Sequence, residues 1–479
     1  MKRLIPLLGI PVITASMILF AGCGKYSQAA NVAIDPGPGD DFPASRHFAI
    51  KVNGEPSFVY QNFKRTTAEK YLKVIKMDSM SWTSFVADQS TEVEVTFLEE
   101  ESLDSVVVRP LSLGIEHEIV GNTITFEIPV GRKVTIEKED DLKHVCFIFA
   151  HPEEPQPVGI EPENIITFER GIHRLDPDPL YIKGNQAVHL KPGAWIEGRI
   201  HGEDLDGAQI VGRGTLSATH VSRLDLKFGE GYAEKRLSRP LNVAGRNIRV
   251  HGPVIVDAPF WSTRIESDDP NGLNQVSHTS VLGWYVNSDG FQDMTHTRAT
   301  DLFTCVNDDS FILNNTGNCV VERSVVWGQL AGAPLRLGWN GIEDLRPIIY
   351  RDIDILHFEG KAGVISLKHG GPSHVKDILI ENIRIENTVH RLVELEIKKH
   401  LWAPKGTGFG QVSNIIIKDI NVHKPLKTEI PSHINGANED HVIRDVTLQN
   451  ISVAGEPVDD FEDLNLRLNE FTENIHLKP

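Results

Sequence analysis

Short apolar runs, each ended by asparagine, aspartate or glycine, recur through the second part of the chain. One order of residues returns in Asn318–Val326, Pro347–Ile355, Asp377–Ile385, Asn414–Val422 and Asp445–Val453. The starts of these units lie 29, 30, 37 and 31 residues apart. A period of that size is typical of a solenoid, in which each unit stacks on its neighbours because it cannot bury its apolar face alone.

The runs within each unit are short and rich in isoleucine and valine, which excludes a helical solenoid. Asparagine recurs at the bends because it tolerates the left-handed backbone conformation, and stacked turns let its amide groups pair. We therefore expect an all-β chain whose residues 166–479 form a right-handed parallel β-helix. The alternative is an ordinary multi-sheet protein whose strands happen to look alike.

Residues 45–165 show a different pattern, in which apolar and polar residues alternate over short stretches. Examples are Phe48–Val52, Val93–Phe97, Val106–Arg109, Thr123–Ile128 and His144–Ala150. Alternation with period two indicates half-buried strands, and many short strands between turns favour a β-sandwich. This part has no cluster of paired carboxylates, so we expect an accessory domain rather than a catalytic one.

The N-terminus has the pattern of an export signal: a basic start, then the apolar run 5–20 and Ala21-Gly22-Cys23. A cysteine directly after Ala-Gly looks like a bacterial lipobox. We expect residues 1–23 to be a lipoprotein signal segment with Cys23 as the lipidated residue, followed by a flexible tether over 24–44. The chain would then be an exported lipoprotein of the cell envelope, held on the outer membrane, at its periplasmic or surface face, only by its lipid. An ordinary signal peptide is the alternative.

Composition and charge narrow the class of partner. With 40% hydrophobic residues, the 479-residue chain can bury a large core. Its formal net charge of −18 argues against a nucleic-acid partner, whose phosphates would be repelled.

After Cys23 only Cys146, Cys305 and Cys319 remain. An odd number is no disulfide framework, and Cys146 and Cys305 lie in apolar runs, which predicts core thiols.

Two matching turns carry the candidate chemistry, Asn287-Ser288-Asp289-Gly290 and Asn307-Asp308-Asp309-Ser310. Equivalent positions on successive coils of a β-helix lie about 4.8 Å apart. Asp289 would therefore face Asp308 and Asp309. Carboxylates that close cannot all ionise freely, so at least one pKa rises, and a protonated acid lies beside an ionised base. Glycosidic hydrolysis needs that pair. Calcium binding and plain turn chemistry are the competing interpretations.

These aspartates resemble the signature of the β-helical glycoside hydrolases in the polygalacturonase–dextranase group. The chain is most similar to the dextranase/isopullulanase family, glycoside hydrolase family 49. Three features carry this likeness: a β-sandwich before the β-helix, Gly283-Trp284-Tyr285 ahead of Asp289-Gly290, and the segment 333–339, Ala-Pro-Leu-Arg-Leu-Gly-Trp.

The resemblance implies an inverting hydrolase. Asp308 would protonate the glycosidic oxygen, and Asp289 and Asp309 would hold and activate the water. Polygalacturonases carry Gly-His-Gly about one coil later, where this chain has Gly328-Gln329-Leu330-Ala331-Gly332. The nearest match to their Arg-Ile-Lys is Ser366-Leu367-Lys368. Both departures point away from pectin and toward a neutral or differently charged glycan.

Around the aspartates we expect flat rings and hydrogen-bonding side chains to contact a poly- or oligosaccharide. The candidates are Trp284, Gln292, Asn307, Gln329, Arg336, Trp339, Lys368 and His369, with Trp402 as a further ring. Glu394 and Glu396 are expected on a solvated strand face. No cofactor or catalytic metal is expected. Two other functions stay open: a polysaccharide lyase using Lys368 as base, and a carbohydrate-binding β-helix without catalysis.

Overall fold

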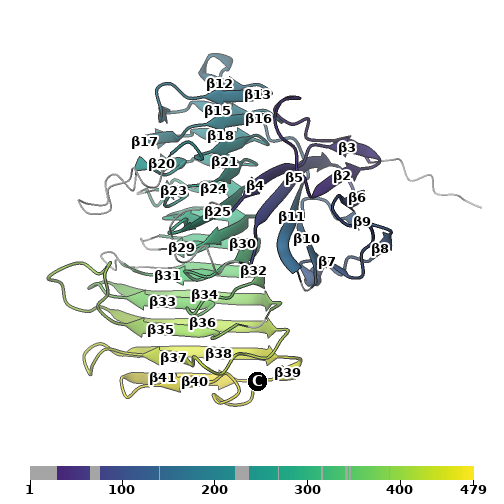
Figure 1. The fold of residues 1–479 in the computed structure, drawn as a ribbon. Coiled ribbons are helices and arrows are strands. Elements are labelled where there is room, and N and C mark those ends of the chain that lie inside the picture. The colour runs from purple at the N-terminus through teal and green to yellow at the C-terminus, as the bar shows by residue number, and fades with distance from the viewer. Residues whose placement is uncertain are drawn as a thin grey trace, which may run out of the picture.

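The computed structural model describes residues 30–64, 76–139, 141–221, 237–267, 269–313, 317–339, 344, 347–387 and 389–479. The predicted signal segment with Cys23 lies outside these residues. The chain forms a β-sandwich that leans against one side of a long parallel β-helix (Figure 1). The predicted fold class is thus confirmed. Among the described residues, none of the helices combines the length and apolarity needed to cross a membrane.

The sandwich consists of two sheets. The sheet nearer the β-helix contains β1 (Val32–Ala33), β4 (Tyr60–Phe63), β5 (Ser79–Ala87), β7 (Val106–Arg109), β10 (Lys133–Lys138) and β11 (Asp141–His151). The other contains β2 (Phe48–Val52), β3 (Glu55–Ser57), β6 (Thr91–Phe97), β8 (His117–Val120) and β9 (Thr123–Ile128). Two short 3-10 helices, η2 (Leu111–Leu113) and η3 (Pro162–Asn164), complete this part.

Alternating burial confirms the strands expected in the sandwich. Phe48, Ile50 and Val52 of β2 point inward, and the residues between them are exposed. The inward faces of both sheets form one apolar core that includes Phe85, Phe126 and Cys146. The predicted tether 24–44 is too long, because β1 pairs with β5 and so belongs to the sandwich.

The β-helix begins with two short strands on each coil, which later fuse into one long strand. The first series is β12 (Ile165–Phe168), β15 (Ala187–Leu190), β18 (Gln209–Gly212), β21 (Arg249–His251), β24 (Asn274–Ser277) and β27 (Thr297–Thr300). The second is β13 (Gly171–Arg174), β16 (Ala194–Glu197), β19 (Thr215–Ser217), β22 (Val254–Val256), β25 (Ser280–Val286) and β28 (Phe303–Asn307). Both series pair with β30 (Cys319–Gly328), which β32 (Ile348–His357), β34 (His374–Ile385), β36 (Gln411–Val422), β38 (Ile443–Val453) and β41 (Thr472–Lys478) continue.

A further face of the β-helix carries the candidate site. Its first sheet contains β14 (Leu180–Tyr181), β17 (Ile200–Asp206), β20 (Leu241–Arg246) and β23 (Thr263–Glu266). Its second contains β26 (Phe291–Gln292), β29 (Phe311–Leu313), β31 (Leu335–Leu337), β33 (Ile365–His369), β35 (Val393–Ile397), β37 (Ser432–Asn435) and β40 (Leu466–Leu468). A short strand, β39 (Glu456–Pro457), pairs antiparallel with β38 near the C-terminus.

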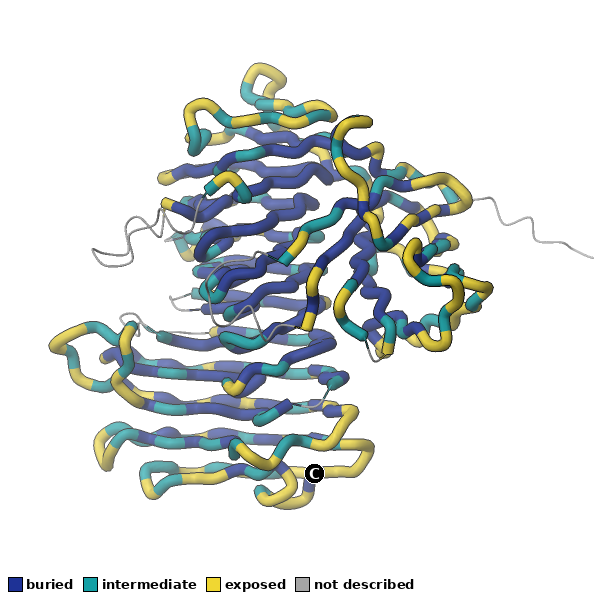
Figure 2. The backbone as a smooth tube through the Cα atoms, in the orientation of Figure 1, coloured by how far each residue is buried: buried dark blue, intermediate teal, exposed yellow. Residues whose placement is uncertain are grey.

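Equivalent residues of the sequence repeat pair with one another in the long strands. Ile378 pairs with Ile348 on one side and Ile415 on the other, and Ile415 pairs with Val446. Asp377 and Asn414 adopt the left-handed backbone conformation, and the Asn414 amide donates to the Asp377 carboxylate at 2.6 Å. The apolar side chains form one continuous core along the coils, visible as buried backbone in Figure 2. Stacked turns and a shared core therefore position the site on a rigid scaffold.

The sandwich and the β-helix share a buried contact. Trp82 and Phe147 of the sandwich pack with Trp284 and Phe303 of the β-helix in one apolar cluster. Cys305 lies in this cluster, and the thiols of Cys146, Cys305 and Cys319 are all free and buried, as expected for core thiols.

Candidate active site

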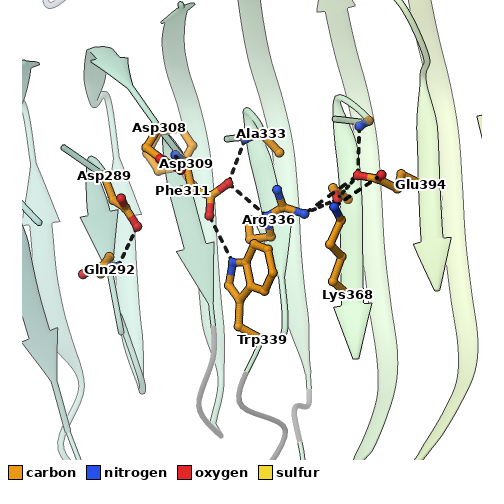
Figure 3. A network of polar contacts seen from close by, with 12 residues as sticks. Asp289, Gln292, Asp308, Asp309, Phe311, Ala333, Arg336, Trp339, Lys368 and Glu394 are labelled. Atoms are coloured by element: carbon orange, nitrogen blue, oxygen red, sulfur yellow. Dashed lines mark hydrogen bonds and ion pairs between the residues drawn. The ribbon is translucent and has the colours of Figure 1, made fainter. Parts of the chain in front are cut away.

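The three aspartates occupy adjacent coils. Asp289 lies in the turn before β26, and Asp308 and Asp309 lie in the turn before β29. β26 and β29 are parallel neighbours, and the Gly290 amide donates to the Asp309 carbonyl at 2.8 Å. One side-chain oxygen from each aspartate lies within 4.8 Å of the other two (Figure 3). The spacing in the sequence thus becomes a convergence of three carboxyl groups.

Asn307 and Gly332 shape the backbone around these carboxyl groups. The Asn307 side chain donates to the Trp284 carbonyl at 3.1 Å and accepts from the Leu330 amide at 3.2 Å. Gly332 has φ +67°, and a Cβ there would collide with the Asp309 backbone nitrogen and lie 2.7 Å from Oδ1 of Asp308. Glycine is therefore required where the next coil passes under the aspartates. Asn307 is buried, so its predicted contact with sugar is wrong and its role is to fix the turn.

Asp309 accepts hydrogen bonds from three fixed donors. They are the Ala333 amide at 2.7 Å, Nε of Arg336 at 2.9 Å and Nε1 of Trp339 at 3.1 Å (Figure 3). All three stabilise a negative charge, and the Arg336 guanidinium also neutralises it. These donors hold the Asp309 carboxylate in one orientation.

Asp308 is the candidate proton donor of the site. Burial, and after it the negative charge of Asp309, raises its pKa to about 7. The amides of Asn287 and Asp309 donate to its oxygens at 3.0 and 2.9 Å, which partly opposes the shift. Asp308 is partly exposed, whereas Asp289 and Asp309 are only 4% and 2% exposed. A carboxyl group of this kind can carry a proton near neutral pH and still reach a substrate.

Asp289 is almost fully buried and has two negatively charged neighbours, Asp308 and Asp309. Burial raises its pKa well above the usual range, and the charges of Asp308 and Asp309 add to the effect. Nε2 of Gln292 donates to Oδ2 of Asp289 at 2.8 Å, and Arg239 in turn donates to Oε1 of Gln292 at 2.8 Å. Oδ1 of Asp289 is buried without a hydrogen-bond partner among the described residues. That oxygen is therefore available to a small polar molecule.

Several side chains predicted to contact sugar lie beneath the surface. Trp284 is fully buried in the contact with the sandwich, so the prediction that its ring stacks on a sugar is wrong. Gln329 is buried and donates to the Gly283 carbonyl at 2.9 Å. His369 is buried with its Nε2 at 2.8 Å from the Ser373 carbonyl. These two predicted contacts are also wrong, because backbone groups already use both side chains.

The other candidates divide into two kinds. Gln292 and Arg336 are buried and bond to Asp289 and Asp309 respectively. They therefore position these carboxyl groups and are not exposed for contact with a sugar. Trp339 and Lys368 are partly exposed beside the aspartates. The Arg336 guanidinium lies 4.6 Å from the centre of the Trp339 ring, and the Lys368 ammonium lies 5.7 Å from it. Trp339 therefore keeps one fixed orientation.

Glu394 is not on a solvated face, contrary to expectation. It is buried, its Oε2 accepts from Oγ of Ser366 at 2.7 Å, and Arg391 donates to its Oε1 at 3.0 Å. The Lys368 ammonium lies 3.5 Å from Glu394 and 3.9 Å from Glu396. A chain of ion pairs thus runs from Asp309 to Arg336 of β31, then to Glu394 of β35, which also contacts Lys368 of β33 (Figure 3).

Two residues near the site carry no signal in the sequence, Trp261 and Arg239. Trp261 precedes Ser262, whose amide donates to the Asp289 carbonyl at 3.0 Å. The Arg239 guanidinium lies 4.7 Å from the centre of the Trp261 ring. The sequence offers one hint for Trp261, an aromatic residue about one coil before Asp289. The repeat is too irregular there to align Trp261 with the aspartate turns.

Acidic and imidazole groups gather in three places among the described residues. Besides the three aspartates, these are His47 with Glu99 and His144, and Glu394 with Glu396 and His433. Carboxylate oxygens suit a hard cation. At the aspartates, however, Arg336 already neutralises Asp309, and the raised pKa values of Asp289 and Asp308 favour protons there. The arrangement is better suited to acid–base chemistry than to a divalent ion.

No protein-family model and no curated protein sequence matches the chain. Among solved structures, Dex49A from Penicillium minioluteum is similar with a TM-score of 0.72 and 16% identity, over 93% of this chain and 96% of that one. An exopolygalacturonase from Thermotoga maritima aligns with a TM-score of 0.46 and 14% identity, over 66% and 84% of the two chains. The family 28 exopolygalacturonase of Yersinia enterocolitica aligns at 0.41 and 11%, over 81% and 96%. The chain thus shares the fold of Dex49A over nearly its whole length.

Proposed function

We propose that this protein hydrolyses glycosidic bonds in a neutral poly- or oligosaccharide. The observation that carries the proposal is the ion pair of Asp309 with Arg336, within reach of Asp308, whose pKa lies near 7. A protonated acid beside a carboxylate is the pair that glycosidic hydrolysis requires. The fold shared with Dex49A and the resemblance to the dextranase/isopullulanase family support it.

In the proposed reaction Asp308 gives its proton to the glycosidic oxygen as the bond to the anomeric carbon breaks. A water held between Asp289 and Asp309 attacks that carbon and loses its proton to Asp309. Oδ1 of Asp289, which has no partner among the described residues, is placed to bind this water. Asp309 then releases its proton to solvent and Asp308 regains one, so the net change is addition of one water across the bond.

Inversion of the anomeric centre is part of the proposal. The side-chain oxygens lie within 4.8 Å of one another, closer than the about 6.5–9.5 Å that is usual between carboxyl groups of inverting enzymes. Inversion therefore rests on the family resemblance, and on two carboxyl groups that can share one water. The anomer of the first product, followed by NMR, tests it.

A neutral glycan is favoured by the charges beyond Trp339. The Lys368 ammonium contacts Glu394 and Glu396, and the Arg336 guanidinium contacts Asp309. Both cations are therefore already paired, and a uronate carboxylate would meet Glu396 and Glu394 instead of a free positive charge. The same pairing disfavours a lyase, because Lys368 is not a free base.

A panel of polysaccharides tests the proposal against its two alternatives. Dextran, pullulan, amylose, a β-glucan and polygalacturonate are each incubated with the protein. New reducing ends without ultraviolet absorbance from an unsaturated sugar support hydrolysis of a neutral glycan. Unsaturated products would indicate a lyase, and binding without cleavage would indicate a carbohydrate-binding protein.

We also propose that the protein is an exported lipoprotein anchored through Cys23. The proposal rests on the basic start, the apolar run and Ala21-Gly22-Cys23. Expression in a bacterium fed a radiolabelled fatty acid should label the membrane-bound protein. Labelling that persists in Cys23→Ser would contradict the assignment.

A further inference from the structure

We infer that the loop joining β35 to β36, residues 398–410, closes the groove over the aspartates and restricts the enzyme to the ends of its glycan chain. This inference rests on the proposed hydrolysis and adds the substrate form: free chain ends rather than internal bonds. It is carried by the contacts that this loop makes on both sides of the three aspartates.

On one side the loop contacts Trp339, the ring that holds Asp309. The imidazole of His400 packs edge-on against Trp339, with 4.9 Å between ring centres. Trp339 donates to Oδ2 of Asp309, so the Trp339 ring links His400 to that carboxylate. Partial burial is the main cause that lowers the pKa of His400.

On the other side the loop contacts Trp261, which belongs to the coil before Asp289. The ring centres of Trp402 and Trp261 lie 6.2 Å apart. Ser262, next to Trp261, bonds the Asp289 carbonyl, and Arg239 links the Trp261 ring to Gln292 and Asp289. Residues 400 and 402 therefore reach from the Asp309 side of the site to the Asp289 side.

Hydrogen bonds and close packing hold the loop in one conformation. The Lys399 ammonium donates to the Gly370 carbonyl at 2.6 Å and to the Gly408 carbonyl at 2.9 Å, which ties the two ends together. The Trp402 amide donates to Nδ1 of His400 at 3.2 Å. A Cβ at Gly370 would lie 2.6 Å from the Ala403 methyl group, so the coil beneath fits the loop closely. Leu401, between the two contact residues, is 82% exposed and therefore faces solvent.

The loop contacts Trp339 and Trp261 on either side of a site in which two of the three carboxyl groups are almost fully buried. Here Asp289 and Asp309 are covered, while Lys368 and Glu396 beyond Trp339 stay partly exposed. A loop that crosses the site from Trp339 to Trp261 admits a chain end and excludes a continuous chain.

One experiment tests the bridge without any sugar. In Trp261→Cys/Trp402→Cys a short bismaleimide should join the two cysteines, detected as linked peptides by mass spectrometry. Trp261→Cys/Leu401→Cys is the matched control, and it should give several-fold less linked peptide because Leu401 points outward. Equal yields in the two variants would overturn the bridge.

A second experiment tests its consequence on the polysaccharide that the panel identifies. The unmodified protein should release a single small product from the outset, with little loss of viscosity per bond cleaved. His400→Ala/Trp402→Ala should release a mixture of sizes and lower viscosity several-fold faster per bond, whereas Leu401→Ala should behave like the unmodified protein. A mixture of sizes from the unmodified protein would overturn the inference. Absence of any turnover, with the cross-link intact, would instead refute the proposed hydrolysis and the chain-end activity that depends on it.

Discussion

Three side chains of one type acquire different chemistry from their surroundings. Asp309 has an arginine, an indole and a backbone amide as donors, whereas Asp308 has two amides and a negative neighbour. Asp289 has a single neutral donor, Gln292, and an oxygen without a partner among the described residues. The site therefore separates a base from an acid without any difference in residue type.

The raised pKa of Asp308 predicts that Asp308→Asn stabilises the folded protein at high pH. In the unfolded chain an aspartate has a pKa of about 3.9, while in the folded protein Asp308 titrates at about 7. Its contribution to stability is fully present below the unfolded value and is lost as pH rises to the folded value. Asparagine does not ionise, so the variant should be more stable by about 2–4 kcal/mol at pH 8.

Chemical denaturation at pH 4 and pH 8 measures this difference. The gain should shrink to about 0.5 kcal/mol at pH 4, where Asp308 is protonated in the folded protein and about half protonated in the unfolded chain. Asp204→Asn, at an exposed bulge of β17 with φ +53°, is the control and should show no such pH dependence. An Asp308→Asn variant that is no more stable at pH 8 would mean that the site holds Asp308 ionised.

At the scale of elements, the stacking of the coils was predictable from the sequence, whereas the exposure of individual side chains was not. Isoleucines such as Ile378 and Ile415 face a common core, so their spacing in the sequence reports the register directly. Burial of Trp284 and Glu394 depends on the sandwich and on charged partners from other coils, which no local pattern encodes. The crossing of Trp402 to Trp261 likewise depends on a loop path that periodicity does not specify.

The turn under the aspartates gives a prediction at the same scale. Gly332→Ala should cost about 3 kcal/mol or more in the free energy of unfolding and most of the activity, because the new methyl group displaces Asp308 and Asp309. Gly159→Ala is a matched control, since Gly159 also has φ +67° but a Cβ there meets nothing within 4 Å. It should cost only about 1–2 kcal/mol of backbone strain and leave activity intact. Equal losses in the two variants would show that contact with the aspartates is unimportant.

For the molecule as a whole, the sandwich is part of the scaffold that carries the candidate site. Its apolar face covers Trp284 and Cys305, which lie on the coils that lead into the two aspartate turns. Glu137 of β10 adds a polar contact: it accepts from Nε1 of Trp327 at 2.7 Å, and Nε2 of His357 lies 2.7 Å away. Loss of this interface should therefore weaken the entire chain and not only the accessory domain.

Glu137→Gln tests that dependence. Burial would raise the pKa of Glu137, but His357, Arg109 and Trp327 together lower it to about 2. The contribution is thus present above about pH 4 and lost as pH falls toward 2. The variant should lose about 3 kcal/mol at pH 7, measured by denaturation that follows both domains, and the loss should shrink in acid. Glu118→Gln, exposed on β8, should change little. An unchanged midpoint for Glu137→Gln would contradict a coupled interface.

The central claim, hydrolysis through Asp308, is tested most directly by one rate comparison. The rate of reducing-end release from the polysaccharide that the panel identifies is measured for the unmodified protein and for Asp308→Asn at pH 6. The account predicts that Asp308→Asn is slower by about 10²–10⁴-fold, because the proton donor is gone while the fold and glycan binding remain. An Asp308→Asn variant that retains the full rate would contradict it.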